Sequence, residues 1–163
     1  MRSALWTLKG KRLAVLGLAF KGGTDDIRDS PAIAVIRMLL KERCEIVAYD
    51  PAATERARKE FSDAPIAFAN SAYEAAEKAD ALLILTDWEE FAALDFPRLR
   101  QALNHPILID GRNLYSRAEM ESHGFFYFSV GRQEAKPNVP ASPQANEREF
   151  TDEENEPEDR KIA

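Results

Sequence analysis

Two cationic side chains follow a short apolar segment near the start of the chain, and this setting predicts a phosphate-binding loop. The apolar run Leu13–Leu16 ends at Gly17, and the residues that follow carry Lys21 and Arg28. A lysine ammonium binds phosphate as a point charge, whereas an arginine guanidinium offers a planar fork of N–H donors. A buried strand followed by such a loop is typical of the ligand-binding edge of an α/β sheet.

The residues around Lys21 are consistent with two interpretations. Gly22-Gly23 permits close approach of the backbone to a ligand. The same loop holds aspartates at positions 25, 26 and 29. Ion pairs between these carboxylates and either Lys21 or Arg28 on a solvated loop are therefore the alternative to ligand contact.

A nicotinamide dinucleotide site within this loop is a further alternative. Gly17, Ala19 and Gly22 give a G-x-A-x-x-G spacing, and Asp50 stands where a ribose-binding acid would end a second strand. In a dinucleotide fingerprint, however, the helix begins inside the glycine motif and directs its N-terminus at the pyrophosphate. Here the helix is expected to begin at Ser30-Pro31, thirteen residues after Gly17. This long loop argues against a self-sufficient NAD site.

The hydrophobic pattern of residues 10–131 alternates apolar strands with amphipathic helices. Predicted strands cover residues 13–17, 45–49, 81–85, 106–109 and 125–130, and predicted helices cover 31–43, 52–61, 71–79, 95–104 and 116–123. Continuous apolar strands joined by helices imply a mostly parallel sheet with helices on both faces. Right-handed crossovers then predict an α/β, doubly wound, Rossmann-like domain.

Polar and cationic groups follow these strands where such a fold binds its ligand. The strand ends carry Phe20-Lys21, Asp50, Thr86-Asp87 and Arg112-Asn113. We expect Arg112 to approach the Lys21 loop, with a bridge to Asp110 or to a helix end as the alternative. Thr86-Asp87-Trp88 receives no site role, because helix capping and packing of the indole account for it.

The loop from Phe20 to Pro31, with the sequence FKGGTDDIRDSP, resembles one protein family in particular. It is similar to the loop that opens the C-terminal domain of the UDP-glucose/GDP-mannose dehydrogenases, and most similar to the UDP-glucose 6-dehydrogenase type. Further segments agree in order and spacing across residues 4–132: Leu5-Trp6, Gly10-Lys11, Tyr49-Asp50-Pro51, Ala79-Asp80, Leu85-Thr86-Asp87-Trp88, Asp110-Gly111-Arg112-Asn113 and Gly131-Arg132.

The resemblance implies a UDP-sugar-binding lobe that closes over a separate NAD-binding lobe. It implies that Phe20, Lys21 and Arg112 contact UDP-glucose or a related UDP-sugar, and that Arg28 reaches the NAD of the other lobe. The family oxidises UDP-glucose to UDP-glucuronate through a covalent intermediate on a cysteine. Cys44, at the expected turn between a helix and a strand, is a turn or core residue rather than that nucleophile.

Two functional expectations follow from the resemblance. In the first, the chain is the UDP-sugar-binding domain of a UDP-glucose 6-dehydrogenase, inactive alone and completed by a separate front-end polypeptide with the NAD-binding and catalytic-cysteine domains. In the alternative, it is a free-standing UDP-sugar-binding or regulatory module without catalysis. A weak NAD-dependent oxidoreductase that uses the G-x-A-x-x-G spacing is a third hypothesis.

Composition excludes several other classes and divides the chain. A net charge of −6 argues against nucleic-acid binding, and no run approaches the about 20 apolar residues of a membrane span. A single cysteine excludes an internal disulfide and favours a cytoplasmic setting, while the isolated His105 and His123 support no metal site. We predict a linker-like segment over 1–10, the UDP-sugar-binding domain over 11–131, and a disordered, acidic, proline-rich tail over 132–163.

Overall fold

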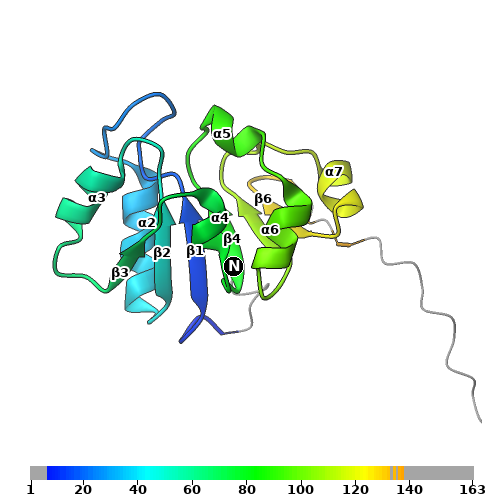
Figure 1. Ribbon diagram of the computed structural model, residues 1–163, viewed down its shortest axis with the longest axis horizontal. Helices are drawn as coiled ribbons and strands as arrows, with labels where there is room; N and C mark the ends of the chain where they lie inside the picture. Colours follow the sequence, from blue (N-terminus) through cyan, green and yellow to red (C-terminus); the bar gives the residue numbers. More distant parts are fainter. Residues whose placement is uncertain (1–6, 133, 135, 138–163) are drawn as a thin grey trace, which may run out of the picture.

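The computed structural model describes residues 7–132, 134 and 136–137 of the 163-residue chain. Six strands alternate with helices along this part of the sequence (Figure 1). The strands are β1 (Arg12–Leu16), β2 (Glu45–Tyr49), β3 (Ile66–Phe68), β4 (Ala81–Ile84), β5 (Ile107–Asp110) and β6 (Phe126–Ser129). The helices are α2 (Pro31–Lys41), α3 (Thr54–Glu60), α4 (Ala72–Ala76), α5 (Glu89–Ala92), α6 (Phe96–Ala102) and α7 (Arg117–Ser122).

The strands form one parallel sheet in the order β3-β2-β1-β4-β5-β6. β1 lies at its centre, where Leu13 pairs with Ile46 on one side and with Ala81 on the other. The chain therefore builds the sheet outward from β1 in one direction and then returns to build it in the other. This order confirms the doubly wound, Rossmann-like α/β fold. The carboxyl ends of the strands lie at the top of Figure 1.

Alternating side chains of each buried strand enter two hydrophobic layers. Leu13 and Val15 of β1 pack in the layer that α2 and α3 cover, whereas Ala14 and Leu16 pack in the layer that α4, α6 and α7 cover. In Figure 1, α2 lies behind the sheet, and α4 and α6 lie in front of it. Leu13 and Leu16 are fully buried, and burial of each such side chain contributes about 1.5–3 kcal/mol relative to exposure.

The expectation of five strands was wrong, because β3 and the short helix α5 carry too little pattern to be read from the sequence. β3 has 3 residues at the sheet edge and only partly buried side chains. α5 has 4 residues, of which Phe91 is buried. Strands need several alternating positions, and helices need at least two turns, before periodicity distinguishes them from loops.

Helix α2 begins and ends at local signals. The Ser30 Oγ accepts a hydrogen bond from the Ala32 N–H at 3.3 Å, and Pro31 occupies the first helical position. After the helix, Arg43 adopts the left-handed conformation with φ 61°, so this turn residue is Arg43 and not Cys44. Cys44 is buried, its thiol donates to the Leu8 carbonyl at 3.3 Å, and burial raises its pKa. These properties agree with the expected core role.

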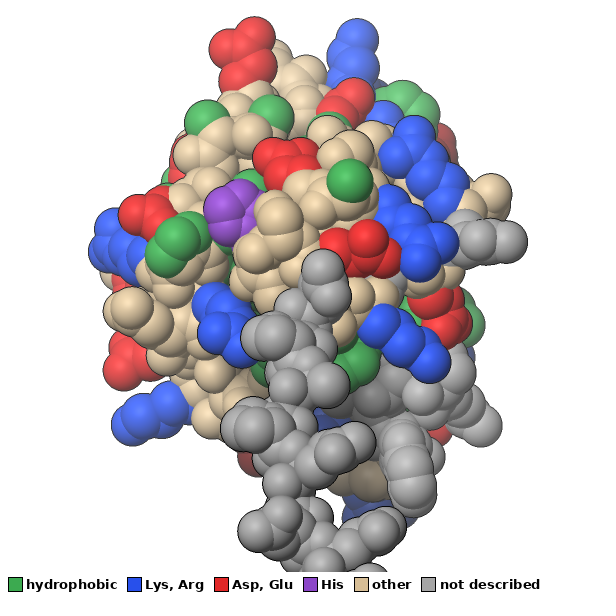
Figure 2. Space-filling model, turned by 90° about the vertical axis from the view of Figure 1, so that its right-hand side faces the viewer, with side chains coloured by type: hydrophobic (Ala, Val, Ile, Leu, Met, Phe, Trp, Pro, Cys, Tyr) green, Lys and Arg blue, Asp and Glu red, His purple; other side chains and the backbone are tan. Residues whose placement is uncertain are grey.

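Part of the predicted domain division lies outside the described residues. This applies to residues 1–6 of the linker-like segment and to nearly all of the predicted tail. Within the described part, no helix has both the length and the apolar character of a membrane span. On the side of the molecule seen in Figure 2, acidic and basic side chains alternate without a broad area of one sign.

Candidate functional site

The loop between β1 and α2 is closed on itself by hydrogen bonds. The Phe20 N–H donates to the Asp26 carbonyl at 2.8 Å, so the predicted contact residues stand on a folded loop. The Phe20 side chain is 50% exposed even though it is apolar. Lys21 is exposed as well, and its ammonium has no hydrogen bond or ion pair with any residue that the structure describes. The loop therefore presents an aromatic ring and an uncompensated cation together.

Arg28 is bound to a carboxylate of its own loop. Its guanidinium donates to Asp26 through Nε at 3.0 Å and through Nη2 at 2.6 Å. The Arg28 hydrogen bonds hold the pKa of the Asp26 carboxyl well below its usual range. Since the Arg28 side chain is 86% exposed, its other N–H groups face solvent. The alternative of an ion pair within the loop thus holds for Arg28, but not for Lys21.

The buried carboxylate of Asp50 uses the N–H groups that a dinucleotide site would need. It accepts from the Leu18 N–H at 2.7 Å and from the Ala19 N–H at 3.0 Å, both inside the G-x-A-x-x-G spacing. It also accepts from the backbone N–H groups of Ala52 and Ala53. The N–H groups of Leu18 and Ala19 are thus taken before any ligand pyrophosphate binds, and α2 begins only at Pro31. This chain's own glycine loop therefore does not fit NAD.

The segment after β4 binds neighbouring loops rather than capping a helix. The Thr86 Oγ donates to the Ala19 carbonyl at 2.6 Å, and the Trp88 indole N–H donates to Asp50 at 3.1 Å. Helix α5 begins after Trp88 without a side-chain cap. The capping role expected for Thr86 or Asp87 was therefore wrong.

Asp87 connects the two loops that carry the predicted substrate-binding cations. Its Oδ1 accepts from the Gly22 N–H at 3.2 Å, and its Oδ2 lies 3.2 Å from Nη2 of Arg112. The hydrogen bond from Gly22 and the guanidinium of Arg112 lower the pKa of the Asp87 carboxyl. Sequence reasoning missed this residue, although its place directly after a buried strand end was a usable signal.

The Asp110 carboxylate fixes the backbone of the loop that carries Arg112. This carboxylate has no exposed surface and accepts from the N–H groups of Arg112 at 2.8 Å and Leu114 at 2.7 Å. The Tyr127 hydroxyl donates to it at 2.8 Å, and burial together with this contact raises the pKa of Tyr127 to about 12. Arg112 thus contacts Asp110 through its backbone, while its guanidinium turns toward Asp87.

Two depressions meet at Lys21 on this edge of the sheet. The first has a volume of about 300 Å³. It is lined by Phe20, Lys21, Thr24, Asp26, Arg28 and Asp29. The second has a volume of about 530 Å³. It is lined by Lys21, Gly22, Gly23, Pro51, Asp87, Trp88, Glu89 and Glu90. The structure therefore brings Phe20, Lys21 and Arg28 to one depression, and places Arg112 beside the second through Asp87.

No metal centre is found in the described part of the chain. No three His, Cys, Asp or Glu side chains there lie close enough to hold an ion. His105 lies 3.8 Å from Asp80, near the amino ends of the strands and away from the cation-bearing loops.

The strand order and the cation-bearing loops define a doubly wound α/β domain whose polar groups gather at the carboxyl edge of the sheet. Residues 14–117 match the UDP binding domain of the UDP-glucose/GDP-mannose dehydrogenase family. The chain belongs to this family.

Several relatives bear the same name. The chain is 49% identical over 125 residues to a UDP-glucose 6-dehydrogenase of Rhizobium meliloti (strain 1021), which covers 77% of this chain and 28% of that protein. It is 54% identical over 114 residues to UDP-glucose 6-dehydrogenase AglM of Haloferax volcanii, covering 69% of this chain and 25% of the relative. The chain thus spans little more than a quarter of the relatives that it matches.

Solved structures of nucleotide-sugar dehydrogenases also align with this chain over about a quarter of their length. A UDP-D-ManNAc dehydrogenase from Pyrococcus horikoshii aligns with a TM-score of 0.66 and 32% identity over 80% of this chain and 28% of that one. A UDP-glucose dehydrogenase from Pyrobaculum islandicum aligns with a TM-score of 0.60 and 31% identity over 68% of this chain and 24% of that one.

Proposed function

We propose that this chain is the UDP-sugar-binding part of an NAD-dependent UDP-glucose 6-dehydrogenase. Phe20, Lys21 and Arg112 bind UDP-glucose in this proposal, and Arg28 contacts NAD held by another domain. Membership of the family and the names of the relatives supply the ligand class. The observation that carries the proposal is that Asp87 contacts both the loop of Lys21 and the guanidinium of Arg112 at one edge of the sheet.

The charges at this edge suit a diphosphate. The Lys21 ammonium has no carboxylate partner among the described residues, so binding does not first require an ion pair to break. Arg112 uses Nη2 toward Asp87 and retains Nε and Nη1 as donors for a second phosphate oxygen. The half-exposed ring of Phe20 offers an apolar surface next to these cations.

Arg28 suits a different contact. The pair with Asp26 fixes one side of its guanidinium, and the exposed remainder points away from the loop. A dinucleotide phosphate or ribose of a facing domain is a fitting partner for such a group. NAD, when bound, supplies hydride acceptance, while Arg28 only orients it.

The same proposal predicts that the chain alone does not oxidise UDP-glucose. Its one cysteine, Cys44, is buried, carries a raised pKa and lies at the amino edge of the sheet. Burial and a raised pKa are the opposite of what a nucleophilic thiolate requires. Turnover therefore requires the catalytic-cysteine and NAD-binding parts of the family.

The binding test uses calorimetry with UDP-glucose on the full chain. We expect weak but saturable binding, and a loss of about 1.5–3 kcal/mol of binding free energy in Lys21→Ala, which is the size of a charge-assisted hydrogen bond. Lys41→Ala, an exposed lysine at the far end of α2, is the matched control. Equal affinity of wild type and Lys21→Ala would remove Lys21 from the site.

A reconstitution test separates the enzyme part from the free-standing module. The chain is co-expressed with a candidate polypeptide that carries the NAD-binding and catalytic-cysteine domains, and NADH formation from UDP-glucose is followed. Activity that appears only with both polypeptides supports the enzyme part. UDP-glucose binding without any activity in the pair favours the module, and NADH produced by the chain alone contradicts both.

A further inference from the structure

Three consecutive side chains after β4 bind the segments that follow β1, β2 and β5. Thr86 donates to the Ala19 carbonyl, Trp88 donates to Asp50 at the end of β2, and Asp87 binds both Gly22 and Arg112. The end of β4 lies between β1 and β5 in the sheet. It is therefore the one strand end that touches both cation-bearing loops of the described chain.

Glycines let these two loops approach the end of β4. A Cβ at Gly22 would lie 2.6 Å from the carbonyl oxygen of Asp87, and a Cβ at Gly111 would lie 3.1 Å from that of Ile84. Each glycine is the chain neighbour of a cation, since Lys21 precedes Gly22 and Arg112 follows Gly111. Both cation-bearing loops thus pack closely against the end of β4.

We propose that Asp87 is a positioning residue of the UDP-sugar site, which ties the Lys21 loop to the Arg112 guanidinium and so orders both cation-bearing loops before the ligand binds. This inference rests on the proposed function and extends it to a side chain that would not itself touch the ligand. One carboxylate oxygen fixes the Gly22 N–H, and the other fixes one edge of Arg112.

A carboxylate near an anion site also repels the ligand, so the sign of its effect must be decided. The Asp87 side chain is 45% exposed, and water screens much of its repulsion toward a phosphate. Without Asp87, in contrast, the long Arg112 side chain and the Gly22 loop would lose freedom only when the ligand binds. Preorganisation therefore outweighs repulsion, and removal of the carboxylate weakens binding.

The test is a double-mutant cycle with UDP as the probe, measured by NMR titration of the full chain, which resolves weak dissociation constants. We expect Asp87→Ala to weaken UDP binding about tenfold, and by a clearly smaller factor in an Arg112→Ala background, where only the contact with the Gly22 loop remains to be lost. Asp87→Asn, which keeps an oxygen for the Gly22 N–H, serves if the alanine variant does not fold. Glu55→Gln, which removes an equal charge from an exposed site on α3, is the control for net charge.

Each outcome bears on the proposal. Unchanged or tighter UDP binding in Asp87→Ala overturns it, and so does an equal loss with and without Arg112, which would indicate a general loop defect. If wild type does not bind UDP, the proposed function fails. The bridge that Asp87 forms between Gly22 and Arg112 is then tested in the ligand-free chain. There, the Gly22 amide should exchange with solvent at least tenfold faster in Asp87→Ala than in wild type, and unchanged exchange overturns the bridge itself.

Discussion

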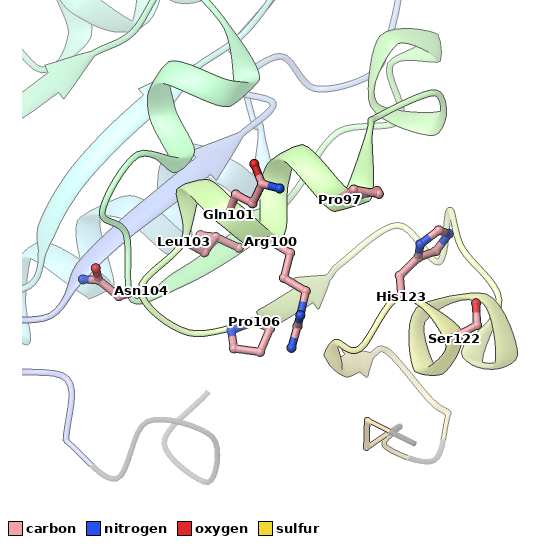
Figure 3. Close-up of a pocket in the computed structure, with 8 residues that line it drawn as sticks. All are labelled: Pro97, Arg100, Gln101, Leu103, Asn104, Pro106, Ser122 and His123. Atoms are coloured by element: carbon pink, nitrogen blue, oxygen red, sulfur yellow. The ribbon is translucent and has the colours of Figure 1, made fainter. Parts of the chain in front are cut away.

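Two regions of this molecule, each with a surface depression and an arginine, differ in what that arginine binds. One is the carboxyl-edge region with Phe20, Lys21, Arg28 and Arg112, which we propose as the UDP-sugar site. The other lies between α6 and α7, with a volume of about 580 Å³, and Figure 3 shows Arg100 and His123 on its opposite sides. The second depression is larger than either depression at the carboxyl edge.

The polar groups of the α6–α7 depression serve the fold. A Cβ at Gly124 would lie 3.1 Å from Nε of Arg100, so this guanidinium rests on the turn before β6. The His123 ring packs on Phe96 with 4.9 Å between ring centroids. At the carboxyl edge, by contrast, Lys21 is exposed with no ion pair to any described residue, and Arg112 is held by a carboxylate from another strand end. The proposed site therefore rests on incompletely paired cations and not on cavity size.

The largest expected difference in the free energy of unfolding is between alanine variants of two aspartates, one buried and one exposed. Asp110→Ala leaves the backbone donors of Arg112 and Leu114 and the Tyr127 hydroxyl without their buried acceptor. We expect a loss of about 3–5 kcal/mol in the free energy of unfolding, measured by urea denaturation. Asp95→Ala, which removes the exposed N-cap of α6, should cost only about 1 kcal/mol. Similar losses in the two variants would show that the Asp110 network is no stronger than an ordinary cap.

Alanine variants of the two arginines should differ in their effect on UDP binding. Arg112→Ala should weaken UDP binding by about 1.5–3 kcal/mol, because a charge-assisted contact is lost. Arg100→Ala should leave the UDP dissociation constant unchanged within error. Calorimetry or NMR titration measures both. A larger effect of Arg100→Ala than of Arg112→Ala would move the site to the α6–α7 depression.

The stability of the protein at alkaline pH tests the hydrogen bond between Tyr127 and Asp110. The pKa of Tyr127 is raised to about 12 by burial and by Asp110, whereas an unfolded tyrosine titrates near 10. Its contribution to stability is complete below pH 10 and is lost as the pH rises toward 12. We expect wild type to lose about 2 kcal/mol more than Tyr127→Phe across this interval, measured by denaturation at each pH. Parallel curves for the two proteins would contradict the raised pKa.

The smallest expected effect concerns the hydroxyl of Thr86. Thr86→Val keeps the shape of the side chain but leaves the buried Ala19 carbonyl without its donor. We expect a loss of about 1 kcal/mol in the free energy of unfolding. Ser122→Ala, at the rim of the α6–α7 depression, removes an exposed hydroxyl bond and should cost less. A Thr86→Val variant as stable as wild type would remove this contact from the set that orders the strand ends.

Strong local patterns made most of the fold predictable. The strands β1, β2, β4 and β5 are short, continuous apolar runs, and their burial follows from that pattern. The start of α2 was predictable from Ser30-Pro31, because an N-cap and a first-turn proline act within a few residues. β3 and α5 were not predictable, since elements of 3 and 4 residues take their form from neighbours.

The candidate site was predictable in its location but not in its pairing. Cations after consecutive strand ends indicate the carboxyl edge, because parallel strands bring those ends together. Which carboxylate faces which cation depends on contacts between distant segments, and the sequence left Asp25, Asp26, Asp29 and Asp110 as equal candidates. In the structure Arg28 binds Asp26, and Arg112 binds Asp87, which had been given no site role.

The sequence by itself determined the alternation of strands and helices, the long loop that argues against an ordinary dinucleotide fingerprint, and the residues available to bind a phosphate. These features depend on the spacing of side chains along the chain, which is already present before folding. Only the tertiary structure decided that Asp87 joins Gly22, 65 residues away, to Arg112, and that Asp50 uses the amides of the glycine loop. Such contacts arise when the sheet order places separate strand ends side by side.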